Sequence, residues 1–286
     1  MSFMNYRRLL IGTVLVIASG GAAVADDAAS AAAPSAPAPP PKPPASLTLP
    51  RGVLEVTVNL EVNASADTVA KPVSIAPDVS YGLTPDVTLM AVHSRYALTG
   101  LRGAAGGGLC VTGTDNGCAH PYDNIGAEGL ISLAKGPLSI AANVGFHALS
   151  FDRGFYAGKV GARLRYTSGR LGFTTLPVLF VAVTHRPDDS ATTPLAADNP
   201  DRFFIPVVLG VTATPELWLG AGAGLKGPLQ ELGDNWQLAV GGLAQYKISP
   251  ELKVGTSLIF GQIVGGNEMT SGADYRWWQL WVSYTR

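Results

Sequence analysis

Apolar and polar residues alternate along most of the chain from residue 51 onward. In residues 54–63, Leu, Val, Val, Leu and Val alternate with Glu, Thr, Asn, Glu and Asn. Successive side chains of a strand point to opposite faces, so this pattern predicts a strand with one apolar face. We expect about twelve such strands on this criterion. The others lie at 73–81, 87–95, 125–134, 138–147, 156–166, 171–184, 203–211, 217–226, from 236 onward, 252–260 and 278–284.

The connections between these strands are tight at one set of positions and mostly longer at the other. Tight turns are predicted at 82–86, 135–137, 167–170, 214–216 and 249–251. Long loops are predicted at 97–123, 185–201, 227–234 and 263–273, and shorter connections at 63–71 and 151–154. Membrane barrels have short periplasmic turns and longer outer loops. The pattern therefore predicts an all-β protein, a transmembrane antiparallel up-and-down β-barrel. A soluble two-sheet sandwich also explains the alternation, but it gives no cause for the loop asymmetry.

Four tyrosines occupy equivalent positions at one rim of this predicted barrel. Tyr81, Tyr166 and Tyr246 each precede a tight turn, and Tyr284 lies near the C-terminus. All four fall on the apolar side of their strands. Because tyrosine has an apolar ring and a polar hydroxyl, we expect them to form an aromatic girdle at the membrane interface.

The composition supports this class of protein. Hydrophobic residues make up 47% of the 286 residues and charged residues only 14%, against roughly 25% charged in a typical soluble domain. The apolar content excludes a fully disordered chain. No run after residue 25 approaches the roughly 18 apolar residues of a membrane-spanning helix. The net charge is −1, and without a clustered basic face we expect no nucleic-acid partner.

The first 50 residues divide into two segments that precede the barrel at 51–286. Residues 1–25 contain Arg7 and Arg8, a short apolar stretch and the sequence Ala-Val-Ala at 23–25, which predicts a cleaved signal peptide. The apolar stretch is too short for the alternative, a membrane anchor. Residues 26–50 form an Ala/Pro-rich periplasmic linker, which we expect to be disordered and extended. It is either a spacer or a docking peptide for peptidoglycan or a periplasmic protein.

Two segments resemble bacterial outer-membrane β-barrel proteins of the porin-like superfamily. They are YGLTPDVTL at 81–89 and the aromatic final strand WWQLWVSY at 277–284, although the chain ends in Arg286 where an aromatic residue is usual. The resemblance covers residues 51–286. It implies location in the outer membrane of a Gram-negative bacterium, with the membrane lipid and the barrel assembly machinery as partners.

Strand parity places nine charged residues in the lumen, with acids mainly in the first half and bases on later strands. They are Glu55, Glu61, Asp78, Glu128, Lys159, Arg163, Arg165, Lys226 and Lys253. On opposed walls of a wet pore they would set ion selectivity. Alternatively, they pair across a closed lumen. The sequence therefore favours a passive channel for small solutes, and leaves open a structural or interaction barrel that binds partners through its linker or loops.

Cysteine and histidine positions decide the remaining chemistry. Cys110 and Cys118 lie in one predicted outer loop of an exported protein, so we expect a disulfide. A metal site would need more ligands than these two thiols, and we expect neither metal nor cofactor. His93 next to Ser94, and His147 three residues before Ser150, point to opposite faces of their strands. Because a Ser–His catalytic pair needs both on one face, we expect no enzyme.

The mature protein is predicted to begin near Asp26. N-terminal sequencing of protein from fractionated membranes should find Asp26, or a residue close to it, in the outer-membrane fraction. Recovery from the inner membrane with Arg7 and Arg8 still attached would contradict the assignment of a signal peptide.

Overall fold

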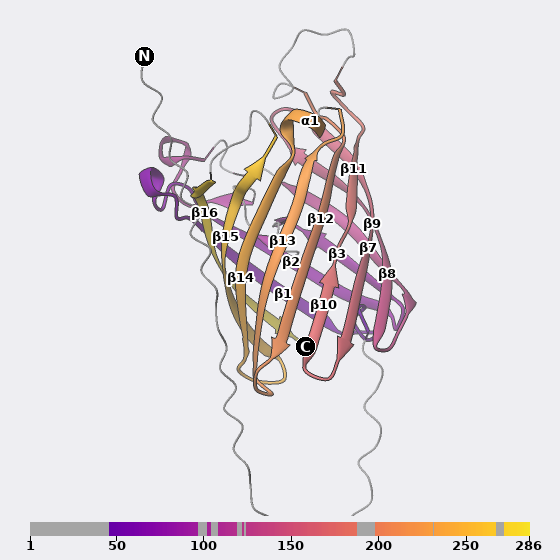
Figure 1. The fold of residues 1–286 in the computed structure, drawn as a ribbon. Helices are drawn as coiled ribbons and strands as arrows, with labels where there is room; N and C mark the ends of the chain where they lie inside the picture. The colour runs from indigo at the N-terminus through magenta and orange to yellow at the C-terminus, as the bar shows by residue number, and fades with distance from the viewer. Residues whose placement is uncertain are drawn as a thin grey trace, which may run out of the picture. The chain divides into compact units, whose positions relative to one another are not determined.

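The computed structural model describes residues 46–96, 102–103, 108–118, 122, 124–187, 198–230, 232–266 and 272–286 (Figure 1). The predicted signal peptide and residues 26–45 of the predicted linker lie outside these residues. Within the described part of the chain, no helix is long and apolar enough to cross a membrane.

All the strands described except β4 and β5 form one antiparallel sheet that closes on itself, because β1 pairs with both β2 and β16. Twelve strand positions surround the lumen, as the alternation predicts. They are β1 (Leu54–Asn63), β2 (Val73–Thr84), β3 (Val87–Val92), β7 (Ile125–Ala134), β8 (Leu138–Ser150), β9 (Phe155–Ser168), β10 (Leu171–Thr175) with β11 (Val178–Ala182), β12 (Arg202–Thr212), β13 (Leu217–Pro228), β14 (Gln237–Lys247), β15 (Leu252–Gly265) and β16 (Gly272–Thr285).

The two ends of the barrel differ as the loop lengths predict. In Figure 1 the tight turns and the C-terminus gather at one end, and the short helix α1 (Leu232–Asn235) lies at the other. Two 3₁₀ turns, η1 (Ala66–Thr68) and η2 (Thr114–Asn116), belong to connections on the long-loop side. We call the two ends the turn end and the loop end.

Two predicted strands are interrupted. The expected strand at 171–184 is β10 followed by β11, and both segments pair with β9 and β12. Pro177 separates them, because proline has no backbone N–H to donate to a ladder. The expected strand at 87–95 ends as β3 at Val92, where the Asp78 carboxylate accepts hydrogen bonds from the backbone N–H groups of His93 and Ser94 at 2.8 and 2.9 Å.

The chain therefore turns inward after β3, since Asp78 is on the lumen side of β2. Two short segments, β4 (Arg95–Tyr96) and β5 (Arg102–Gly103), pair with each other, and β5 lies alongside β1. The chain then returns to the wall as β6 (Leu109–Cys110), which pairs with β2 beyond the end of β3.

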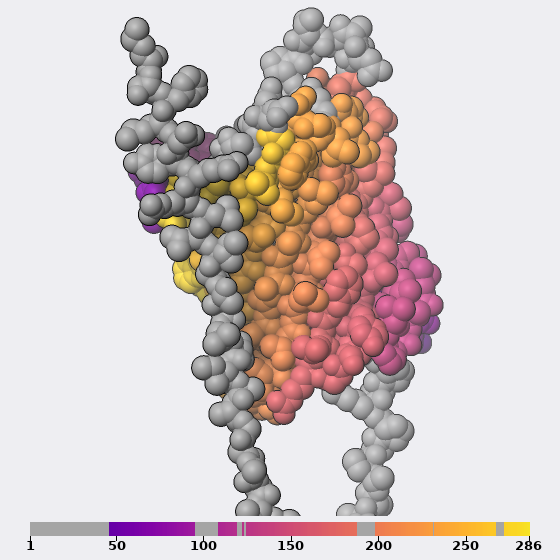
Figure 2. All heavy atoms as spheres, viewed as in Figure 1, coloured from indigo at the N-terminus to yellow at the C-terminus, as the bar shows by residue number. Residues whose placement is uncertain are grey.

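Burial alternates along the strands and identifies their two faces. On β1, Val58 is 41% exposed and the next residue, Asn59, is 3% exposed. On the barrel strands, exposed Leu, Val, Ile and aromatic side chains alternate with buried positions, and they form part of the closely packed outer wall seen in Figure 2. The four girdle tyrosines also point outward and are 43–50% exposed. Their role at the membrane interface stays a prediction.

Cys110 and Cys118 form a disulfide, as expected, with their Cα atoms 6.2 Å apart. Cys110 belongs to β6 and pairs with Ser74 of β2. The closed loop is short, so its contribution to stability should not exceed about 2–3 kcal/mol on the loop-entropy estimate.

We predict that the barrel stays folded when this disulfide is reduced, because the backbone hydrogen bonds between the twelve wall strands do not depend on it. Reduced and alkylated protein should keep its β-sheet circular dichroism and its heat-dependent shift in gel mobility. Loss of the folded band on reduction alone would show that β6 and its loop are needed to keep the barrel closed.

Candidate functional site

The centre of the lumen contains a buried ionic cluster carried by three neighbouring strands. Glu128 on β7 accepts hydrogen bonds at Oε2 from Lys159 Nζ on β9 at 2.6 Å and from Asn143 Nδ2 on β8 at 3.0 Å. His147 Nε2, also on β8, lies 3.0 Å from Glu128 Oε1. The side chains of Glu128 and Lys159 are fully buried. The pair is therefore held by its own partners and not by bulk water.

Glycines on the facing positions make room for this cluster. Gly145 lies opposite Glu128 in the β7–β8 register, and a Cβ there would stand 2.8 Å from Glu128 Cγ. Gly126 lies opposite His147, where a Cβ would collide with the imidazole ring. The side chains of Glu128 and His147 therefore lie over the backbone of the neighbouring strand, where the glycines have no side chain to block them.

This arrangement bears on the two alternatives that the sequence leaves open, charges on opposed walls of a wet pore or charges that pair. Glu128 and Lys159 are only two strands apart and form an ion pair. Removing one partner of a buried pair leaves an uncompensated charge, which costs about 3–5 kcal/mol. For these two residues the paired alternative holds.

Apolar clusters adjoin the ionic cluster inside the barrel. One contains Met90, Val92, Leu130 and Ala141. Another contains Ala157, Leu176, Val178 and Phe180, and Phe180 meets the His147 ring edge-on at 5.3 Å. The positions of charged residues alone do not predict these apolar contents. Strand parity could have found Met90 and Val92, which share a face with Thr88.

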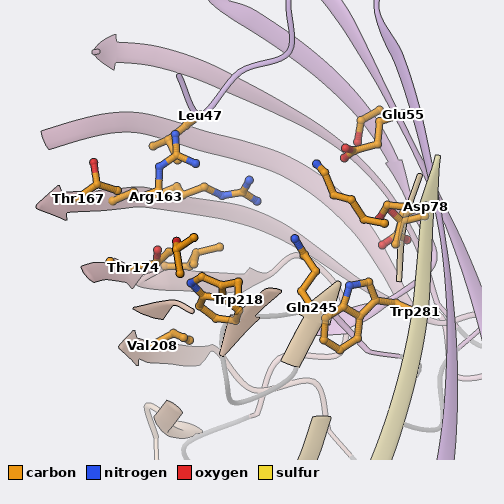
Figure 3. A pocket seen from close by; sticks show the side chains of 18 of the residues that line it. Leu47, Glu55, Asp78, Arg163, Thr167, Thr174, Val208, Trp218, Gln245 and Trp281 are labelled. Atoms are coloured by element: carbon orange, nitrogen blue, oxygen red, sulfur yellow. The ribbon is translucent and has the colours of Figure 1, made fainter. Parts of the chain in front are cut away.

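A cavity of about 600 Å³ occupies the turn-end half of the lumen. We call it the turn-end vestibule, because Thr167, Gly169 and Thr212 next to the tight turns line it. Figure 3 shows Arg163 and Trp218 on one wall and Glu55, Asp78 and Trp281 on the facing wall. The charged residues lining it are Glu55, Asp78, Arg163, Arg165, Arg170 and Lys253.

Two tryptophans lie against glycines of the vestibule wall. A Cβ at Gly255 would collide with the Trp281 indole, which lies opposite it in the β15–β16 register. A Cβ at Gly210 or Gly220 would collide with Trp218. The missing side chains therefore let both indoles lie close to the backbone, which keeps the vestibule open.

The acids of the lumen are engaged in hydrogen bonds. Asp78 holds the backbone of His93 and Ser94 and also accepts from the Ser94 hydroxyl. Glu55 accepts from Thr285 Oγ1 at 3.3 Å, and buried Glu61 accepts from the Gln279 amide. Asp78 therefore fixes the start of the segment that follows β3, and Glu61 links β1 to β16. Knowing only that both acids face the lumen does not reveal these roles.

The two remaining predicted bases lie on later strands, Lys226 on β13 and Lys253 on β15. Lys226 on β13 pairs in register with Gln237 toward the loop end, and Lys253 lines the vestibule. The His93 ring contacts the Tyr122 hydroxyl, whereas the Ser94 hydroxyl donates to Asp78, so the two side chains have different partners.

The end of the predicted linker enters the vestibule. Residues 46–50, which we call the inner strap, lie against the lumen side of β3 and β9. Arg165 Nη2 donates to the Ser46 carbonyl at 2.7 Å, Thr48 Oγ1 donates to the Pro85 carbonyl at 2.9 Å, and the Leu49 amide donates to Thr88 Oγ1 at 2.8 Å. Leu47 packs against the cluster of Met90 and Val92. The sequence assigned these residues to the linker because only their composition was visible.

A closed antiparallel barrel with an apolar outer face and a charged interior is the architecture of an outer-membrane porin. Solved porin structures share it. The chain matches the NanC porin with a TM-score of 0.56 at 9% identity, covering 80% of this chain and 98% of that one. It matches the KdgM porin with a TM-score of 0.50 at 8% identity, with the same coverages. These likenesses show the fold. No protein-family model and no curated protein matches the chain.

The buried ion pair makes a testable prediction about stability. Lys159→Met should lower the free energy of unfolding by about 3–5 kcal/mol, because Glu128 would stay buried without its cation. Urea unfolding of the refolded barrel in lipid or detergent measures the change. The double variant Lys159→Met/Glu128→Gln should recover much of the loss. Lys253→Met, the control in the vestibule, should leave the unfolding free energy nearly unchanged, and equal losses for both lysines would contradict the argument.

Proposed function

We propose that the protein is a passive outer-membrane channel for small hydrophilic solutes, with a preference for anions. The turn-end vestibule carries this proposal, since it is a cavity inside a porin-type barrel lined by several charged side chains. Charged groups at a water-filled lumen must be hydrated or paired, and hydrated ones attract counter-ions.

The balance of charge in the vestibule favours anions. Four bases, Arg163, Arg165, Arg170 and Lys253, line it against two acids, Glu55 and Asp78. The Asp78 carboxylate already accepts three hydrogen bonds from His93 and Ser94. A cavity with an excess of one sign raises the local concentration of the opposite ion.

The channel should be narrow. A twelve-stranded barrel is wider than the eight-stranded barrels that side chains fill, but narrower than the 16–18-stranded porins. The apolar clusters and the Glu128–Lys159 pair occupy the centre, so passage depends on the space left beside them. We therefore expect small currents and exclusion of large solutes.

The second candidate is a closed structural or interaction barrel, and the same central packing favours it. In this case the linker or the outer loops would bind the partner, such as peptidoglycan or a periplasmic protein. Single-channel recording of the purified protein in a planar bilayer separates the candidates, because a folded barrel without conductance would support the closed one.

Export by the signal peptide, the tyrosine girdle in outer-membrane lipid and insertion by the barrel assembly machinery belong to this same proposal. The apolar outer face and the exposed tyrosines at the turn end support it. The porin-type fold also favours transport over catalysis.

Reversing one vestibule charge should change ion selectivity. Arg163→Glu should move the reversal potential in a salt gradient toward cation preference, because Arg163 lines the vestibule. Folding should be little affected, since lumen substitutions tune selectivity more than insertion. Lys71→Glu, in an exposed position of the β1–β2 connection, should leave the potential unchanged. An unchanged potential in a conducting Arg163→Glu barrel would place the ion path elsewhere.

A further inference from the structure

We propose that the inner strap is a displaceable plug, and that small oxyanions release it by taking Arg165 away from the Ser46 carbonyl. The proposal rests on the proposed channel only for its consequence, the change in conductance. The displacement itself depends on the contacts of residues 46–50 with the lumen wall.

The inner strap is held by a few separable contacts. Beyond the hydrogen bonds of Thr48 with Pro85 in the β2–β3 turn and of Leu49 with Thr88 on β3, its N-terminal half has two anchors. These are the Leu47 side chain on the apolar cluster and the Arg165 guanidinium on the Ser46 carbonyl. Close passage at the other end is possible because residue 82 is glycine, where a Cβ would collide with the Pro50 carbonyl. The strap thus has a fixed end at Pro50 and a latched end at Ser46.

We call the hydrogen bond from Arg165 to the Ser46 carbonyl the latch. It leaves one hydrogen-bond donor of the Arg165 guanidinium without a partner among the described residues. Its Nη2 donates to the Ser46 carbonyl, but among the described residues its buried Nε has no hydrogen-bond partner. An unpartnered buried donor is costly. Nε and one Nη of arginine form a planar edge that matches two oxygens of one carboxylate or phosphate. A single carbonyl oxygen cannot fill that edge, whereas an oxyanion can.

An oxyanion at Arg165 would therefore satisfy both donors and displace the Ser46 carbonyl. Arg163 lies two residues away on the same face of β9 and lines the same vestibule, so a second cation attracts the anion to this position. Without the Arg165 contact, the described contacts that remain are the apolar packing of Leu47 and the hydrogen bonds of Thr48 and Leu49. The end of the strap at Ser46 and Leu47 can then move away from the wall, while the end at Pro50 stays fixed. The anion that the vestibule attracts thus also displaces the inner strap from the vestibule. Binding of the solute is therefore coupled to opening of the channel.

Thiol labelling tests the displacement directly. Leu47→Cys is introduced into the full-length protein with the Cys110–Cys118 disulfide kept oxidised, and its labelling by a polar maleimide is timed in detergent. Inorganic phosphate should accelerate labelling about tenfold or more over sodium chloride of equal ionic strength, because one charge-assisted hydrogen bond is replaced. Ser168→Cys, at the exposed end of β9, is the control and should label equally in both salts.

A second variant isolates the latch. In Arg165→Gln, Leu47→Cys should label fast in both salts, whereas in Arg170→Gln, the matched control in the vestibule, the phosphate effect should persist. Labelling that ignores phosphate, or an Arg165→Gln variant that behaves like its parent, would overturn the proposal. If Arg165→Gln fails to show the folded gel band, the phosphate effect in the chain with Arg165 decides alone.

Planar-bilayer recording separates this proposal from the channel itself. Conductance that is low in chloride and rises with phosphate or in Arg165→Gln supports both. Phosphate-dependent labelling in a barrel that never conducts supports the displaceable plug and overturns the channel. Conductance with phosphate-independent labelling does the reverse.

Discussion

Closure of the sheet between β1 and β16 is the constraint on which the other features depend. Once the two edges pair, every second side chain must enter an enclosed space and every other one must face outward. The outer side chains can be uniformly apolar, but the inner ones must satisfy their hydrogen bonds among themselves or with water. The division of the lumen into a packed centre and a vestibule lined by polar and charged groups is one solution to that requirement.

The packed centre shows how the lumen charges are satisfied. Glu128 lies among Lys159, Asn143 and His147, each from β8 or β9, and glycines on the facing positions give them room. A buried ion pair contributes little net stability compared with apolar packing, but losing half of it is expensive. The cluster therefore fixes which side chains can occupy the centre. The bases Arg163 and Lys253 instead line the vestibule toward the turn end.

Much of the fold was predictable because its period is two residues. Alternation locates the strands, loop lengths distinguish the ends, and parity places Glu55, Lys159 and Arg163 inside. Parity cannot say which inner residues meet, since that depends on register between strands: Glu128 reaches Lys159 only because β7, β8 and β9 align as they do. The inner strap escaped prediction for a related reason. Residues 46–50 have the composition of a linker, and only contacts with distant Pro85, Thr88 and Arg165 give them a place.

One position of the barrel wall, next to β2, is shared by two separate strands, β3 and β6. This affects which changes in chain length the barrel tolerates. β3 covers one part of β2 and β6 covers another, and Leu109 of β6 also bridges to Tyr122, just before β7. The wall is thus completed from both sides of the intervening segment, while Asp78 and the disulfide secure its two ends. Insertions or deletions between the two anchors need not shift the register of any neighbouring strand. A change in the length of this segment therefore leaves the barrel wall intact.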